Sequence, residues 1–90
     1  MSLTKAEQTI QLAAWKQFPA QELWIKDDKY FLGYDKGTDS VSVTTGVYSE
    51  SGLVYNTVIH NTEDVEGFVD ALVSQKIVEN WKCFASQMFV

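Results

Sequence analysis

The sequence contains no arginine, and its twelve acidic residues outnumber its seven lysines. Arginine is the usual reader of guanine edges and a strong side-chain clamp for phosphates. The net charge at pH 7 is −5. Because arginine is missing and the charge balance is acidic, we expect neither nucleic acid nor an anionic membrane as a partner.

Cysteine and histidine are also scarce, since Cys83 and His60 are the only ones in the chain. An internal disulfide is therefore excluded, and a reducing compartment, the cytoplasm, is the expected location. A structural zinc site needs four nitrogen or sulfur ligands. Neither residue lies in a nucleophile motif, and the chain has no glycine-rich phosphate loop. We expect no metal, no cofactor and no catalytic residue.

Long hydrophobic runs are missing as well. No apolar stretch approaches the roughly 20 residues of a membrane span, and Met1–Phe18 lacks the apolar segment of a signal peptide. Of the 90 residues, 46% are hydrophobic, including three Trp, four Tyr and five Phe. This content predicts one domain, residues 1–90, whose core needs neither a disulfide nor a metal.

Two segments carry the signals of helices. In a capping box at Thr4 and Glu7, each side chain satisfies the backbone amide of the other residue, and apolar residues then recur at helical spacing. Pro19 ends this helix because it disfavours the helical conformation at Phe18. A second helix is predicted over Asn61–Gln75, with a polar cap and three carboxylates in its first turn.

Between the helices, four short segments rich in aromatic and β-branched residues predict an antiparallel meander. Their ranges are Leu23–Ile25, Tyr30–Tyr34, Val41–Tyr48 and Leu53–His60. Asp27-Asp28 is expected to form a two-residue turn. Alternation in the last two strands places Val43 opposite Val58 and Val47 opposite Val54. The predicted fold class is α+β: an N-terminal helix, a four-stranded antiparallel meander and a C-terminal helix with a kinked or separate last segment.

The alternation also predicts two unlike faces of the sheet. We call the first the valine face; it carries Val41, Val43, Val54 and Val58. With a two-residue turn, Leu23 and Ile25 share this face, and both helices are expected to pack there. The other side, the opposite face, carries six large apolar residues: Trp24, Phe31, Tyr48, Leu53, Tyr55 and Ile59. A sheet with one solvated polar face would not carry these six, so the patch is normally covered or used.

The chain after Lys76 is a candidate cover for the opposite face. The apolar stripe of the second helix changes direction there, so later residues must pack on another surface. The alternative covers are a second copy of the chain and a different protein partner. The candidate partner-binding residues are therefore Trp24, Phe31, Tyr48, Tyr55, Trp81, Phe84 and Met88.

These patterns favour a small acidic, non-enzymatic protein-interaction module of the regulator, inhibitor or adaptor type, which self-associates through an aromatic patch. The alternative is a small-ligand binder or minor enzyme with a pocket between the sheet and the tail. An acidic mimic of nucleic acid is a third hypothesis. The element order is similar to that of double-stranded-RNA-binding domains. Those domains need positive charge where this second helix opens with Glu63, Asp64 and Glu66, so the resemblance implies a topology and no RNA binding.

Overall fold

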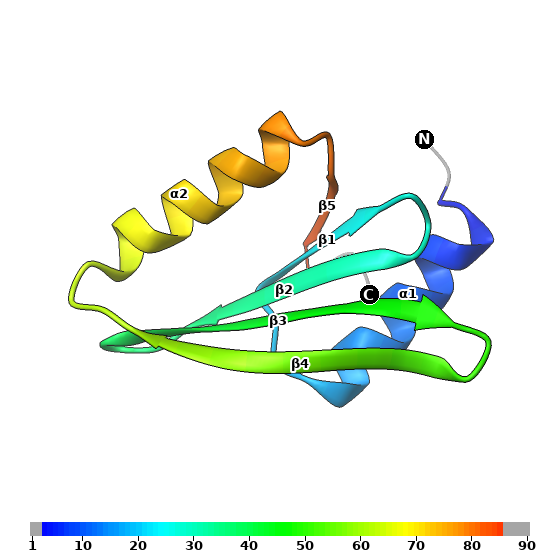
Figure 1. The fold of residues 1–90 in the computed structure, drawn as a ribbon, viewed down its shortest axis with the longest axis horizontal. Helices are drawn as coiled ribbons and strands as arrows, with labels where there is room; N and C mark the ends of the chain where they lie inside the picture. Colours follow the sequence, from blue (N-terminus) through cyan, green and yellow to red (C-terminus); the bar gives the residue numbers. More distant parts are fainter. Residues whose placement is uncertain (1–2, 86–90) are drawn as a thin grey trace.

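Seven elements make up residues 3–85, the part of the chain that this computed structural model describes. They are α1 (Lys5–Gln17), β1 (Glu22–Lys26), β2 (Tyr30–Lys36), β3 (Ser40–Ser49), β4 (Gly52–Asn61), α2 (Val65–Val78) and β5 (Lys82–Ala85). The strands form one antiparallel sheet in the order β4-β3-β2-β1-β5 (Figure 1). The predicted α+β order of helix, antiparallel meander and helix is confirmed, and a fifth strand follows it.

The predicted capping box begins α1. The Thr4 hydroxyl accepts a hydrogen bond from the Glu7 amide at 3.0 Å, and the Glu7 carboxylate accepts one from the Thr4 amide at 2.9 Å. The helix ends at Gln17, and Phe18 after it is extended, which is the conformation that a following proline favours. Both ends of α1 therefore follow from local sequence.

The β3–β4 hairpin has the predicted register. Val43 pairs with Val58, and Val47 pairs with Val54. Because successive side chains of a strand point to opposite sides, this pairing places all four valines on one face. The prediction of the valine face is therefore confirmed for these two strands.

The turn of the first hairpin contains one residue more than predicted. Asp27 and Asp28 have positive φ angles of 56° and 58°, and the Lys29 amide donates to the Lys26 carbonyl at 3.2 Å. Lys26 nevertheless pairs with Tyr30, so Lys29 is an extra residue in the ladder. A slip of one position turns every side chain of β1 to the other face.

The predicted faces of β1 are wrong for this reason. Trp24 pairs with Leu32 and joins the valine face, while Leu23 and Ile25 lie on the opposite face with Phe31. Both faces of the sheet thus carry large apolar groups near β1 and β2. Each of them needs a cover.

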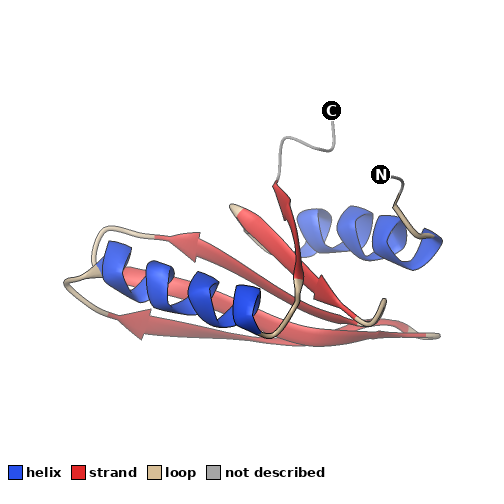
Figure 2. Ribbon diagram, turned by 90° about the horizontal axis from the view of Figure 1, so that it is seen from above, coloured by secondary structure: helices blue, strands red, loops and turns tan. Residues whose placement is uncertain are grey.

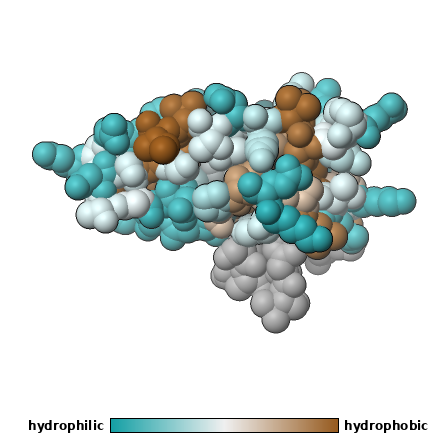
Figure 3. Space-filling model, turned by 90° about the horizontal axis from the view of Figure 1, so that it is seen from below, coloured by the Kyte–Doolittle hydropathy of each residue, from teal (hydrophilic) through white to brown (hydrophobic). Residues whose placement is uncertain are grey.

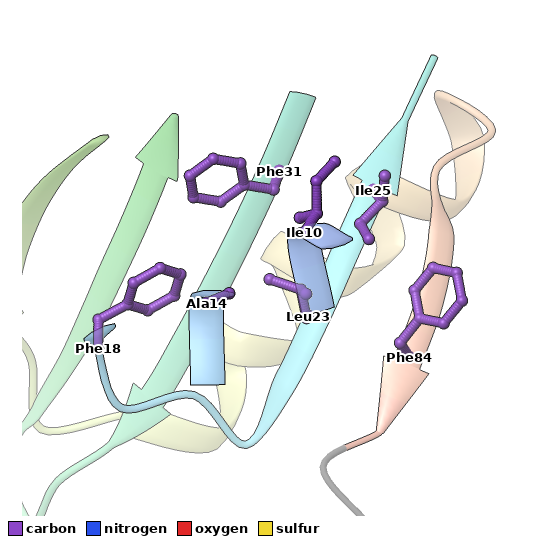
Figure 4. Close-up of a cluster of buried hydrophobic side chains, with 7 residues drawn as sticks. All are labelled: Ile10, Ala14, Phe18, Leu23, Ile25, Phe31 and Phe84. Carbon is purple, nitrogen blue, oxygen red and sulfur yellow. The ribbon is translucent and has the colours of Figure 1, made fainter. Parts of the chain in front are cut away.

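The two helices cover opposite faces of the sheet, whereas the sequence predicted both on the valine face. In Figures 1 and 2, α2 lies along one side of the sheet and α1 along the other, towards the other end of the strands. The α2 core, on the valine face, contains the buried residues Trp24, Leu32, Tyr34, Val41, Val43 and Val69. The α1 core, on the opposite face, contains Ile10, Ala14, Phe18, Leu23, Ile25, Phe31 and Phe84 (Figure 4).

Burial follows the positions of the helices rather than the valine pattern. Val43 is 8% exposed, as predicted, whereas Val58 is 45% exposed and its predicted burial is wrong. β3 has neighbouring strands on both sides, but β4 is an edge strand. The valine face therefore loses its cover between β3 and β4.

The last segment is separate from α2, but it is a strand and not a helix. α2 runs without interruption to Val78, and Asn80, with a φ of 64°, then redirects the chain into β5. β5 pairs with β1 and brings Phe84 into the α1 core, on the other side of the sheet from α2. Trp81 instead packs against the α2 core, as Phe68 and Leu72 do, so its predicted separation from that helix is wrong. Met88 lies outside the described residues.

Candidate functional site

The aromatic residues expected to bind a partner do not form one surface in the described chain. Trp24 is buried in the α2 core, whereas Phe31 and Phe84 are buried in the α1 core. α1 takes the place over the opposite face that the sequence had left to the tail, a second copy or another partner. Tyr48 is partly buried against the α1 core, and Tyr55 stays exposed.

Trp81 is held by its neighbours at the end of α2. Its indole Nε1 donates to Glu79 Oε1 at 3.0 Å, and Lys76 Nζ lies 4.6 Å from the centre of the Trp81 ring. These contacts fix the indole beside the α2 core and leave it half-buried. The contacts of Trp81 with Glu79 and Lys76 are therefore contacts within its own chain.

Four of the exposed large apolar side chains lie on β4. Val54, Tyr55, Val58 and Ile59 are 60%, 37%, 45% and 65% exposed, and we call these four residues the β4 strip. Val54 and Val58 point to the valine face, and Tyr55 and Ile59 point to the opposite face. One strand thus offers apolar side chains on both sides of the sheet.

β4 also presents an open backbone edge. The Thr62 amide donates to the Asp39 carbonyl at 3.0 Å, which fixes the phase of the ladder between β3 and β4. Because hydrogen-bonded and non-bonded pairs alternate, even-numbered residues of β4 bond to β3 and odd-numbered residues, 53 to 61, direct their amides and carbonyls outwards. Such a row is a template for another strand, and natural edges are usually protected by charge, proline or bulges.

No such protection occurs on β4. The strand runs for 10 residues as GLVYNTVIHN, without a charged residue or a proline, between Glu50 and Glu63. Seen from below, the side along which β4 runs, the molecule shows two separate hydrophobic areas, one to the left and one to the right (Figure 3). The lack of charge over this stretch was visible in the sequence, but its meaning depends on β4 lying at an edge.

The helices leave different halves of β4 open on the two faces. On the valine face, the Phe68 ring of α2 lies 5.0 Å from the His60 ring, at the C-terminal end of β4. On the opposite face, the Phe18 ring that follows α1 lies 5.1 Å from the Tyr55 ring, towards the N-terminal end. Val54 and Ile59, at the two uncovered positions, are the most exposed residues of the strip.

A small polar pocket lies elsewhere, at the far edge of the sheet. Its volume is about 350 Å³, and it is lined by Glu7, Ile25, Lys26, Asp27, Asp28, Asn80 and Lys82. Burial alone would raise the pKa of Glu7, but the hydrogen bonds from Lys82 and from the Thr4 amide lower it below its usual value. The carboxylate inside this pocket is therefore a stabilised anion rather than a proton donor at neutral pH.

Two groups near Glu22 also have shifted pKa values, Tyr34 and Cys83. Burial, and then the hydrogen bond to Glu22 Oε1 at 2.8 Å, raise the pKa of the Tyr34 phenol. Cys83 is exposed at the surface, but desolvation by nearby groups and the same carboxylate raise the pKa of its thiol to about 11. Both groups are thus held in their neutral forms. That is the reverse of what a nucleophilic thiolate needs.

Within residues 3–85, no group of three or more His, Cys, Asp or Glu side chains is placed to hold a metal ion. No helix in the same range is long and apolar enough to cross a membrane.

The β4 strip and its open edge are the strongest candidate site in this part of the chain. No protein-family model, no curated protein and no solved structure matches the sequence.

Proposed function

We propose that the protein is a small acidic, non-enzymatic interaction module of the regulator, inhibitor or adaptor type, which binds a protein partner along β4. The observation that carries the proposal is the conjunction of an open backbone edge with apolar side chains on both faces of the same strand. A strand added to such an edge gains main-chain hydrogen bonds, and the side chains on alternate sides supply specificity.

The charges of the module agree with a protein partner. A net charge of −5 without arginine disfavours phosphate backbones. At the start of α2, Glu66 pairs with Lys36 at 3.1 Å, so one of the few lysines is already engaged by a carboxylate. We propose the cytoplasm as the location, because a single cysteine suits a reducing compartment.

A small-ligand or enzymatic function has less support. The polar pocket lies beside the ends of β1 and β5, but Tyr30, Tyr34 and His60, whose presence would favour that alternative, do not line it. Its buried carboxylate has a lowered pKa, whereas a general acid at neutral pH needs a raised one. Neither feature favours catalysis over a structural ion pair.

Selection of short peptides displayed on phage tests the proposal without a known partner. We expect selected peptides to bind as strands, and NMR titration should shift the amides of residues 53–61 most strongly. The double variant Val58→Lys with Ile59→Lys should abolish binding, because it places charge on both faces of the edge. Peptides that shift α2 or the polar pocket instead would contradict the proposal.

A control exists on α2, where Ile77 and Val78 are exposed apolar residues of the same types. Ile77→Lys with Val78→Lys adds the same charge to the protein without touching β4. This control variant should bind the selected peptides as the unaltered protein does. Loss of binding in both variants would show that net charge, and not the β4 strip, governs the interaction.

A further inference from the structure

We infer that the partner of β4 is the β4 strand of a second copy of this chain, and that the two strands pair antiparallel with Asn56 opposite Asn56 of the second copy. This inference rests on the proposed interaction function and gives it a partner and a register. The product is a continuous ten-stranded sheet with a two-fold axis perpendicular to it. Isologous contacts of this kind are the commonest in homo-oligomers.

The residue pattern of β4 selects this register. In a two-fold pair, valine-face residues meet valine-face residues, so a residue must lie on the axis. With Asn56 on the axis, Val54 lies opposite Val58 of the second copy. On the other face, Leu53 lies opposite Ile59 of the second copy. Every large aliphatic residue between Leu53 and Ile59 thus meets another aliphatic residue.

The neighbouring register is less complementary. With Thr57 on the axis, Val54 would face His60 of the second copy, and Val58 would face Asn56 of the second copy. Leu53 would then face Asn61 of the second copy. Tyr55 would face Ile59 of the second copy, but three apolar residues would meet polar ones, and both exposed valines would gain less burial.

The backbone agrees with the register centred on Asn56. Odd-numbered residues of β4 direct their amides and carbonyls outwards, so they form the hydrogen-bonded pairs with the second copy. Leu53 with Ile59, and Tyr55 with Thr57, are such pairs. Asn56 and its equivalent form a pair without backbone hydrogen bonds, in which the side chains come closest.

The two helices agree with a two-fold axis as well. On the valine face, α2 covers the end of β4 at His60 and leaves Val54 open. Rotation by 180° brings the α2-covered end of the second copy beside that open half. On the opposite face, the rotation likewise brings the end covered by α1, near Tyr55, beside the exposed Ile59. Each helix of one copy thus lies beside the half of β4 that the other copy leaves bare.

The charges that flank β4 give the contact a defined response to salt. In this register, Glu50 lies opposite Thr62 of the second copy and therefore next to Glu63 of the second copy. Like charges meet at both ends of the pair, and each protomer has a net charge of −5. Salt screens this repulsion within about 10 Å at 0.1 M. Association should therefore strengthen as ionic strength rises, in contrast to binding of a basic partner.

Disulfide trapping tests the register. In a Cys83→Ser background, Asn56→Cys places two thiols across a pair whose Cα atoms are about 4.5 Å apart, within the range of a disulfide. In the same background, Thr57→Cys is the matched control, because in this register its two thiols lie beyond the roughly 7 Å limit. Mild oxidation should convert Asn56→Cys to a covalent dimer and leave Thr57→Cys monomeric on non-reducing gels.

Light scattering and amide exchange complete the test. The unaltered chain should form a species of twice its 10.2 kDa mass, and the odd-numbered amides of β4 should gain protection with protein concentration. A monomer at every concentration, a trapped Thr57→Cys dimer or a dimer that neither cysteine traps would overturn the inference. Peptide binding to β4 by a strictly monomeric protein would preserve the proposed function while removing the second copy as its partner.

Discussion

Lys82 Nζ donates to Glu7 Oε2 at 2.8 Å, and this ion pair joins residues 75 positions apart in the sequence. The Glu7 side chain is buried, whereas the Lys82 side chain is largely exposed. The same carboxylate closes the capping box of α1 through the Thr4 amide. One side chain thus begins the first helix and ties it to the last strand.

Glu7→Ala should lower the free energy of unfolding by about 1–3 kcal/mol, because it removes two hydrogen bonds to a buried carboxylate. Glu7→Gln should cost less, since the amide oxygen still accepts and the Lys82 ammonium stays in water. Urea denaturation at pH 7 measures both variants. Equal stability of Glu7→Ala and the unaltered protein would show that this ion pair contributes nothing.

The contribution of Glu7 should depend on pH in a defined direction. Folding lowers the pKa of Glu7 below its usual value of 4.5, so its contribution is present above that pH and is lost as the pH falls through the folded value. The stability difference between the unaltered protein and Glu7→Gln should therefore narrow between pH 5 and pH 3. Urea denaturation across this range measures the stability difference. A difference that widens as the pH falls would contradict the lowered pKa of Glu7.

Gly46→Ala should lower the free energy of unfolding by roughly 1–3 kcal/mol through overpacking. A Cβ at Gly46 would lie 2.7 Å from Phe31 Cζ and 2.7 Å from Tyr55 Cβ, and would also meet the Val54 carbonyl. Thr45→Ala, at the exposed neighbouring position, is the control and should change little. Thermal melts compare the midpoint temperatures of the two variants. Equal midpoints would show that the β-sheet backbone relaxes around the added methyl group.

Val43→Ala and Val58→Ala should differ, although the two valines pair across the same ladder. Val43 lies in the α2 core, so its truncation should cost about 1–3 kcal/mol. Val58→Ala should stay within roughly 0.5 kcal/mol in dilute solution, because Val58 is 45% exposed and lies outside both cores. Denaturation at two protein concentrations separates the effects: a Val58 penalty that grows with concentration reports the paired edge.

The Cys83 thiol should react slowly at neutral pH. Its pKa is raised to about 11 by desolvation and by Glu22, so the thiolate fraction at pH 8 is small although the residue is exposed. Alkylation rates followed by mass spectrometry between pH 7 and pH 10 should rise throughout this range. Glu22→Gln should speed the reaction at pH 8, whereas Asp39→Asn should not. A rate at pH 8 equal to that of free cysteine would contradict the raised pKa.

Much of the fold could be predicted because its signals are local. The capping box needs only Thr4 and Glu7, and alternation sets the pairing of Val43 with Val58. The faces of β1 could not be predicted, since they depend on whether Lys29 is counted in the turn or in the ladder. One extra residue exchanges the two faces of β1. The five residues of β1 carry apolar side chains on both faces, so their pattern does not distinguish the two arrangements.

The candidate site was predictable only in its chemistry. Apolar residues without a cover were expected, but the chosen aromatics Trp24 and Phe31 turned out to be core residues. The exposed group lies on β4 because α1 and α2 occupy different faces and, among residues 3–85, β4 pairs with β3 alone. That arrangement arises from tertiary packing, which periodicity along a single strand does not encode.

The docking of β5 against β1 determines the order in which this sheet can be completed. The four meander strands meet neighbours in the sequence, but β1 must wait for a strand that lies beyond α2. Closing such a long loop is entropically costly and slow, so the β1–β5 pairing forms late. Until then β1 is a second unpaired edge without its neighbour Phe84. The chain therefore exposes two unpaired strand edges, and is most prone to misassembly, after the meander forms and before β5 docks on β1.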